Sequence, residues 1–341
     1  MIKSRHALVL TCALLALGTA ACGEKKTKTP ETTESVAARE STQAEETKQA
    51  GEAKLETPEQ LAVSLLVRNS GREIVNLEPN GMGIEDKHYS FPDWAEVPTL
   101  PVAASEGLHE AMKRYEEEQT AALKKFAETH RNDSEQDYPV MYAGDVTICR
   151  SDSNFFSFVR GVNSFTTDAE GYSYDSRTGE VLTLSQVVKD MSRLQDAVDE
   201  VLKESDESEH AALAKEALAK DAIVWALGNE GLELFIAQSD GYYVDYQRIV
   251  ISYERYPELF SEGVKLRPAV YAAQLMTKAK SYIDGKVVQV KAPETEGGSF
   301  TVMVDDKRFT LEKPEMAGGL ISLLYVKTAS GSYLYPEFRG D

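Results

Sequence analysis

Large apolar side chains are almost missing from residues 23–60, and this gap limits where the chain can build a core. The segment consists mainly of Glu, Lys, Thr, Ala and Gln, and it contains no aromatic residue. Such a composition buries too little apolar surface to offset the entropy lost on folding. We therefore expect a disordered tether over residues 23–60 and a folded part that starts near residue 61.

The first 22 residues have the order of a bacterial export signal. Two basic residues precede an apolar run over 7–17, and small residues lead to Cys22. The run is too short to span a bilayer and is typical of a secretory signal peptide. Its Ala-Ala-Cys22 ending resembles the lipobox of bacterial lipoproteins, although Thr19 stands where that family usually has leucine. The resemblance implies cleavage before Cys22 and acylation of its thiol, and the alternative is an ordinary signal peptide cleaved after Ala21.

Acylation of Cys22 would place the protein at the extracytoplasmic face of the cell membrane, held there by fatty acids such as palmitate. The sequence then divides into a lipoprotein signal peptide (1–22) and a polar tether (23–60), followed by an α+β domain (61–262) and a small β-rich domain (263–341). The membrane would be contacted through the lipid anchor alone.

The charge balance bears on the kind of partner. Lys and Arg number 37 against 56 Asp and Glu, which gives a net charge of −19. A surface this acidic repels phosphate backbones and anionic headgroups, so we expect no nucleic-acid binding. It favours a cationic partner or simple solubility.

The pattern of apolar residues predicts the fold class. Steps of three and four residues predict a helix from Ser105 to near Asn132 and a second one that opens at Thr183 or Ser185 and runs through Leu202. Residues 204–220 are rich in Ala, Glu and Lys and are also expected to be helical, as are residues 266–282. The stretch 80–101 is typical of a loop. Short apolar runs predict strands at 140–150, 154–165, 171–175, 223–227, 232–237, 249–253, 287–290, 300–304, 309–311, 321–326 and 333–335. We expect an α+β fold, with an antiparallel sheet packed with helices and a small β-rich C-terminal region.

Four segments, taken in their order along the chain, resemble those of a known family. They are residues 146–154 (VTICRSDSN), 174–185 (YDSRTGEVLTLS), 229–232 (NEGL) and 251–260 (ISYERYPELF). Together they resemble the bacterial extracytoplasmic domain family shared by the lysozyme-sensing anti-sigma factor and the N-terminal part of a peptidoglycan deacetylase. The resemblance covers about residues 85–262 and implies a lipoprotein or membrane-anchored protein of the cell envelope.

Two loops depart from that family. Many relatives have a Gly-Gly-Ala-His stretch where this chain has residues 161–167, and a Pro-Tyr-Glu segment where it has residues 239–246. A ligand role that relatives assign to those loops is therefore not carried over. The deacetylase activity of one relative belongs to a separate domain, and its metal-binding histidines have no counterpart here.

The sequence offers few groups for catalysis. It has no phosphate loop, no nucleophile elbow, no His-Glu-x-x-His and no paired-cysteine motif, so we expect no cofactor and no metal. Cys149 would be the lone thiol of the mature chain, and its apolar context predicts a small buried residue in a strand. Asp305 and Asp306 could join an acid–base pair or a calcium site, but aspartates are also common in hairpin turns.

An aromatic and acidic loop is the candidate ligand site. It contains Asp240, Tyr242, Tyr243, Asp245 and Tyr246. Exposed tyrosines stack on sugar rings or anchor protein partners, and the flanking aspartates attract cationic groups. The alternative is an ordinary hairpin whose tyrosines alternate between core and solvent.

These observations predict a non-enzymatic binding or sensing module at the cell envelope. Its partner would be a cationic protein such as lysozyme, or cell-wall glycan. One alternative is a hydrolase that acts on envelope polymers through carboxylates, and another is a structural lipoprotein without a ligand.

Overall fold

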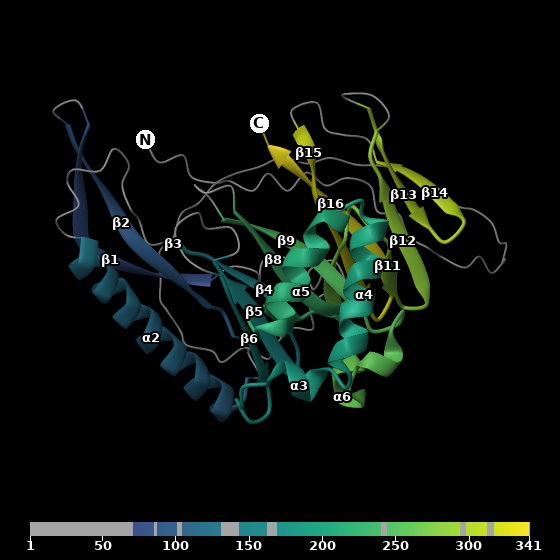
Figure 1. The fold of residues 1–341 in the computed structure, drawn as a ribbon, viewed down its shortest axis with the longest axis horizontal. Coiled ribbons are helices and arrows are strands. Elements are labelled where there is room, and N and C mark those ends of the chain that lie inside the picture. The colour runs from purple at the N-terminus through teal and green to yellow at the C-terminus, as the bar shows by residue number, and fades with distance from the viewer. Residues whose placement is uncertain are drawn as a thin grey trace, which may run out of the picture.

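The protein is a mixed α+β fold built from antiparallel sheets, as the sequence predicts (Figure 1). A computed structural model describes residues 71–84, 87–100, 104–130, 143–161, 169–239, 244–293, 298–311 and 317–340. The predicted signal peptide, Cys22 and the tether lie outside the described residues. Of the helices in the described ranges, none combines the length and apolar character needed to cross a membrane.

A long hairpin and a long helix form the N-terminal part. The elements are β1 (Gly71–Ile84), β2 (Lys87–Pro98) and α2 (Glu106–His130), followed by the short β3 (Ala143–Gly144), which pairs in parallel with β2. The Ser105 hydroxyl accepts a hydrogen bond from the Leu108 amide (3.1 Å) and so caps α2 at its predicted start. In Figure 1 the helix runs along the hairpin.

The loop predicted over residues 80–101 was wrong, because this stretch belongs to the hairpin. Its pairing shifts between Asn76 and Asn80, opposite Asp93 and Phe91. Proline cannot donate to a ladder, and it is tolerated at such an irregularity. Pro79 and Pro92 both fall inside the shift, so the prolines mark a bulge instead of ending the strands.

Two three-stranded sheets and several helices form the centre of the molecule. The first sheet contains β4 (Val146–Ser151), β5 (Phe155–Arg160) and β6 (Glu170–Asp175), and the second contains β7 (Val224–Leu227), β8 (Gly231–Ser239) and β9 (Val244–Ser252). The helices are α3 (Leu184–Val187), α4 (Met191–Glu204), η1 (Ser208–His210), α5 (Ala211–Ala219), η2 (Pro257–Leu259) and α6 (Glu262–Lys265).

Successive side chains of a strand point to opposite faces of its sheet, so each face packs against a different layer. On the first sheet, Phe156 and Phe158 join a core cluster with Leu108 and Tyr115 of α2. On the second sheet, the alternate residues Leu232, Leu234 and Ile236 pack against α4 and α5. The two sheets meet through their remaining faces, in a smaller cluster around Val159, Ala226 and Phe235.

The second predicted helix was wrong in its continuity, because it is broken into α3 and α4. Val188 pairs with Phe260 as an isolated bridge, which requires extended backbone. Asp190 then starts α4 afresh, since its Oδ1 accepts from the amides of Ser192 (3.0 Å) and Arg193 (3.3 Å). An apolar stripe that continued across the break concealed it in the sequence.

The C-terminal part consists of strands. One sheet has the order β10 (Tyr271–Leu275), β15 (Ala317–Thr328), β16 (Gly331–Gly340), and the other is β11 (Ser281–Ile283), β12 (Lys286–Lys291), β13 (Phe300–Val304), β14 (Lys307–Leu311). The helix predicted over 266–282 was wrong. Tyr271 and Leu275 face the same core at a spacing of four, which also fits a strand, and Ala273 between them faces that core as well.

A contact between two glycines joins α2 to the turn that ends β6. Gly179 has φ +73°, and a Cβ built on it would lie 2.1 Å from the carbonyl oxygen of Gly107. A Cβ on Gly107 would lie 2.1 Å from the carbonyl oxygen of Thr178. The Ser105 hydroxyl also donates to the Ser176 carbonyl (2.6 Å). The turn within residues 174–185 thus receives the first turn of α2, and only glycine fits at its closest point.

We expect Gly179→Ala to lower the free energy of unfolding by about 3 kcal/mol or more. The new Cβ strains the backbone at positive φ, and it also forces α2 away from the turn. Gly285→Ala is the control, since Gly285 also has positive φ (+67°) but has open space around it. That variant should lose only about 1 kcal/mol. Urea denaturation measures both, and equal losses would contradict the close packing.

Candidate functional site

The predicted ligand loop is described only in part. Asp240, Tyr242 and Tyr243 lie outside the described residues. Asp245 is exposed at the start of β9, where its Oδ1 accepts from the Tyr246 amide (2.8 Å). Tyr246 is half-buried against Phe235 and its neighbours, and its hydroxyl accepts from the Ala169 amide (3.0 Å). The Tyr246 ring is therefore engaged with the sheet and offers only part of its surface to a ligand.

Asp305 stabilises a turn of the C-terminal sheet. It lies in the turn between β13 and β14 with φ 52°, and its Oδ1 accepts from the Val287 amide (2.9 Å). Aspartate tolerates the positive φ of this turn position, and its bond to Val287 ties the turn to β12. In the described residues, no three His, Cys, Asp or Glu side chains are grouped as a metal site would require.

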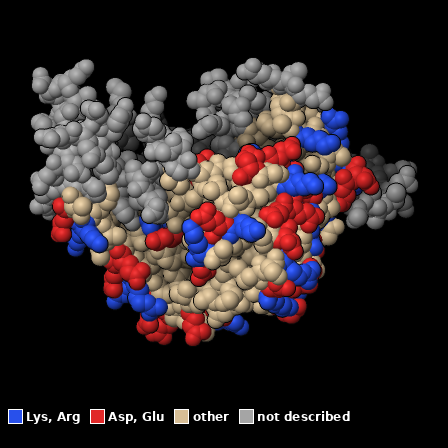
Figure 2. Space-filling view, viewed as in Figure 1, with Lys and Arg blue, Asp and Glu red and all other residues tan. Residues whose placement is uncertain are grey.

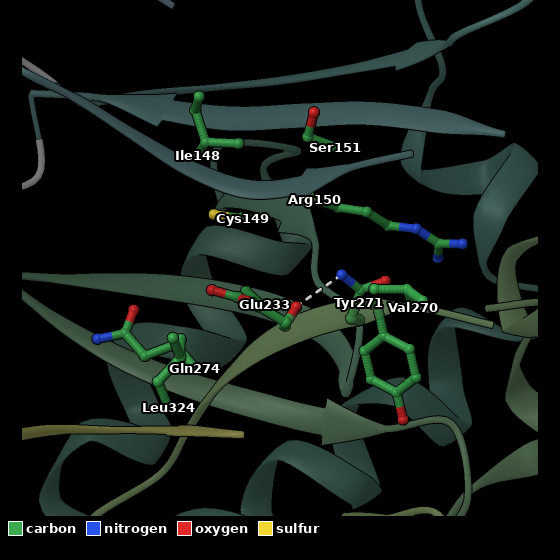
Figure 3. Close-up of a pocket in the computed structure, with 11 residues that line it drawn as sticks. Ile148, Cys149, Arg150, Ser151, Glu233, Val270, Tyr271, Gln274 and Leu324 are labelled. Atoms are coloured by element: carbon green, nitrogen blue, oxygen red, sulfur yellow. Dashed lines mark hydrogen bonds between the residues drawn. The ribbon is translucent and has the colours of Figure 1, made fainter. Parts of the chain in front are cut away.

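The strongest concentration of buried polar groups lies where the C-terminal strands meet the central sheets. A cavity of about 60 Å³ opens there. Figure 3 shows Cys149 and Arg150 from β4, Glu233 from β8 and Gln274 from β10 around it. Asn229, Tyr271 and Leu324 also line it. The volume suits a few water molecules and is far below the 300–1,000 Å³ typical of pockets that enclose a ligand.

Arg150 is the largest fully buried side chain of this junction, with 1% of its surface exposed. Its Nε donates to Asp152 (2.6 Å), and one terminal nitrogen donates to the Val264 carbonyl (2.8 Å). The other donates to the Leu266 carbonyl, and the Phe155 ring lies 4.8 Å from the guanidinium carbon. The guanidinium thus joins the β4–β5 hairpin to the segment that leads into the C-terminal strands.

A second, partly buried ion pair crosses the β8–β9 ladder. Nε of Arg248 donates to Glu233 (2.7 Å), and its NH2 donates to the Gln274 carbonyl on β10 (2.7 Å). Both side chains point from the second sheet toward β4. There, burial and the nearby Glu233 carboxylate raise the pKa of the Cys149 thiol well above its usual range. The raised pKa favours the protonated thiol at neutral pH. Cys149 lies in a strand as predicted, but it is half-buried beside the cavity and not fully buried.

The turn between β7 and β8 carries two more buried polar residues. Asn229 donates from its amide nitrogen to the Ala272 carbonyl (2.7 Å), and Glu230 Oε1 accepts from the Tyr282 amide (3.0 Å). Burial raises the pKa of Glu230 to about 8, despite an opposing effect of Arg248. Asn229 Oδ1 and Glu230 Oε2 have no hydrogen-bond partner within the described part of the chain.

Half-exposed groups complete the junction. Arg267 donates to the Asn229 carbonyl and to Glu254 (2.6 Å), and Glu254 in turn accepts from the amides of Asp284 (2.7 Å) and Gly285 (2.8 Å). Asp284 also accepts from the hydroxyls of Tyr271 and Tyr325. These contacts hold the β11–β12 turn against the second sheet.

Chemically, the junction is suited to holding two parts of the chain together. Its guanidinium groups donate to carboxylates and carbonyls, and its cavity admits only small molecules. No family model matches this chain, and no curated protein is similar enough to be a recognisable relative. The resemblance described for residues 85–262 therefore stays a prediction that rests on its motifs.

Sequence reasoning did not single out these junction residues as a group. One signal was present, because Glu233 interrupts an otherwise apolar run over residues 232–237. A charge inside a buried strand demands a partner. The sequence does not name that partner, which lies fifteen residues away at Arg248.

Replacing Arg150 with Met should lower the free energy of unfolding by about 3–5 kcal/mol, because Asp152 and two backbone carbonyls lose a buried donor. Arg177→Met is the matched control, since Arg177 also pairs with an aspartate two residues away but is 68% exposed. That variant should leave stability almost unchanged, because solvent screens an exposed ion pair. Chemical denaturation compares the two, and similar small losses would show that Arg150 is not a structural tie.

Proposed function

We propose that this protein is a lipoprotein of the extracytoplasmic face of the membrane and that its folded part is a non-enzymatic binding or sensing module. Its partner would be a cationic protein, such as a basic wall-degrading enzyme, or cell-wall glycan. The observation that carries the location is the N-terminal order of basic residues, apolar run and Ala-Ala-Cys22. The tether over 23–60 would keep the module clear of the membrane.

The acidic helical layer supports a cationic partner. In residues 191–221, which include α4 and α5, nine Asp and Glu stand against four Lys and Arg. Figure 2 shows carboxylates among scattered basic groups over the face where Figure 1 places these helices. Asp196, Asp199 and Glu209 are exposed there. Such a field attracts cations over distances that salt screens.

The junction supports binding over turnover. Of its buried acidic side chains, Asp152 and Glu233 each pair with an arginine, and Glu230 accepts from the Tyr282 amide. Hydrolysis of a polymer by two carboxylates needs room for a sugar ring and a water between them. The cavity beside Glu233 is far smaller than that. The site that touches a partner is then expected on the surface, in the helical layer or in the loop around Asp245.

Cys22→Ser should abolish incorporation of labelled fatty acid and release the protein from the membrane fraction, because the acylated thiol would be lost. Cys149→Ser is the control and should leave labelling unchanged. Metabolic labelling followed by fractionation of cells gives both readouts. An unlabelled wild-type protein, or one found wholly inside the cell, would overturn the proposed location.

Binding to lysozyme, taken as a basic probe protein, should weaken steeply as salt rises from 50 to 300 mM, because the attraction is between exposed charges. Asp196→Asn combined with Asp199→Asn should weaken binding several-fold at low salt. Glu117→Gln combined with Glu118→Gln on α2 is the matched control and should have little effect. Calorimetry without a salt-dependent signal would count against a cationic partner.

A further inference from the structure

We propose that Glu230 is a proton-operated latch between the second central sheet and the C-terminal strands: the junction is closed while this carboxyl is protonated, and ionisation opens it. The proposal concerns the stability of the junction and does not depend on the identity of the partner. Glu230 lies in the turn between β7 and β8, which contacts β10 through Asn229 and β11 through Glu230 itself.

The geometry around Glu230 suits a neutral acid. The residue is 2% exposed, and one carboxyl oxygen accepts from the Tyr282 amide while the other has no partner within the described ranges. A buried carboxylate with one unpartnered oxygen is strongly disfavoured. The protonated form carries no charge and needs only one acceptor, such as a water or a neighbouring oxygen, for its hydroxyl. The adjacent Asn229 Oδ1 is a buried acceptor that also lacks a partner there.

The arginines of the junction donate their hydrogen bonds to acceptors other than the Glu230 carboxyl. Arg248 binds Glu233 and the Gln274 carbonyl, and Arg267 binds Glu254 and the Asn229 carbonyl. Arg150 on β4 binds Asp152 and two carbonyls. The groups that act on the Glu230 carboxyl are Glu233 on β8, Arg248 on β9, and the Ser281 side chain and Tyr282 amide on β11. The Tyr253 amide donates to the Glu230 carbonyl, and Arg267 bonds the carbonyl of the neighbouring Asn229. Burial is the largest effect and opposes ionisation, with a small contribution from Glu233. It outweighs Arg248, the Tyr282 amide and the Ser281 side chain, which all favour the ionised form.

The sign of the pH effect follows from the two protonation states. Burial raises the pKa of Glu230 to about 8 in the closed junction, while the ordinary pKa of a glutamate is 4.5. Between these values the closed form holds a proton that the open form has lost. Opening therefore becomes more favourable as pH rises, and the effect levels off above about pH 8.

Opening would affect a defined set of contacts. The hydrogen bond from the Tyr282 amide to Glu230 breaks. The Asn229–Ala272 hydrogen bond weakens with it, because Asn229 lies in the same turn. The Ser252 hydroxyl bond to the Tyr282 carbonyl (3.1 Å) lies in the same layer. The result is a loosening of β10–β12 from the central sheet that leaves α2 and its cluster in place.

Hydrogen exchange of the full chain, measured between pH 5 and 9 and corrected for intrinsic exchange rates, tests the latch. Protection of residues 271–291 should fall by up to about tenfold per pH unit between pH 5 and 8 and then level off. Peptides from α2 should not follow this profile. A corrected protection of 271–291 that is flat with pH would overturn the proposal.

Two variants separate the latch from ordinary packing. Glu230→Gln imitates the protonated acid and should remove the pH dependence. Glu254→Gln weakens the same junction from its half-exposed side, so it should lower protection at every pH and keep the slope. A slope in Glu230→Gln equal to that of the wild type would refute the latch. Should that variant not fold, a carboxyl-carbon NMR titration of wild-type Glu230 decides: a midpoint above pH 7 supports the proposal, and one near 4.5 overturns it.

Discussion

The structure depends on the fact that a buried guanidinium cannot lose its charge. Arginine stays protonated inside proteins, so each buried arginine must be surrounded by acceptors. The buried Arg150 and the partly buried Arg248 meet this demand with one carboxylate each and with backbone carbonyls of residues 264, 266 and 274. Those carbonyls belong to the start of the C-terminal part. The position of that part on the central sheets therefore follows from the placement of two charges on β4 and β9.

The core agrees with this arrangement. The apolar cluster between α4, α5 and the second sheet also includes Val264, Met276 and Ala279, which lie beyond the expected boundary at residue 262. Lys278 bonds the buried Glu207 just before η1. Apolar packing and ion pairs thus join the C-terminal strands to the centre over several elements. Glu230 differs from the arginines because a carboxyl can become neutral on burial, so its charge can change with pH while theirs cannot.

Periodicity predicted most elements well, and its failures have physical causes. Strands such as β5, β8 and β13 were predicted because apolar and β-branched runs end at turn residues. The helix over 266–282 was wrong because a spacing of four is compatible with both periods. The break at Asp190 was missed because a capping side chain can restart a helix while the apolar stripe continues. The hairpin around Pro92 was missed because proline marks bulges as well as loops.

The sequence by itself determined the kinds of most elements, such as the strands β5, β8 and β13, and the cap that Ser105 gives to α2. These properties depend on residues close to one another along the chain. Only the tertiary structure decided which polar groups are buried and what they bind. Arg150 meets the carbonyl of Val264 114 positions away, and Glu230 meets the amide of Tyr282 52 positions away. Burial and proton affinity are properties of such distant contacts, so local pattern cannot specify them.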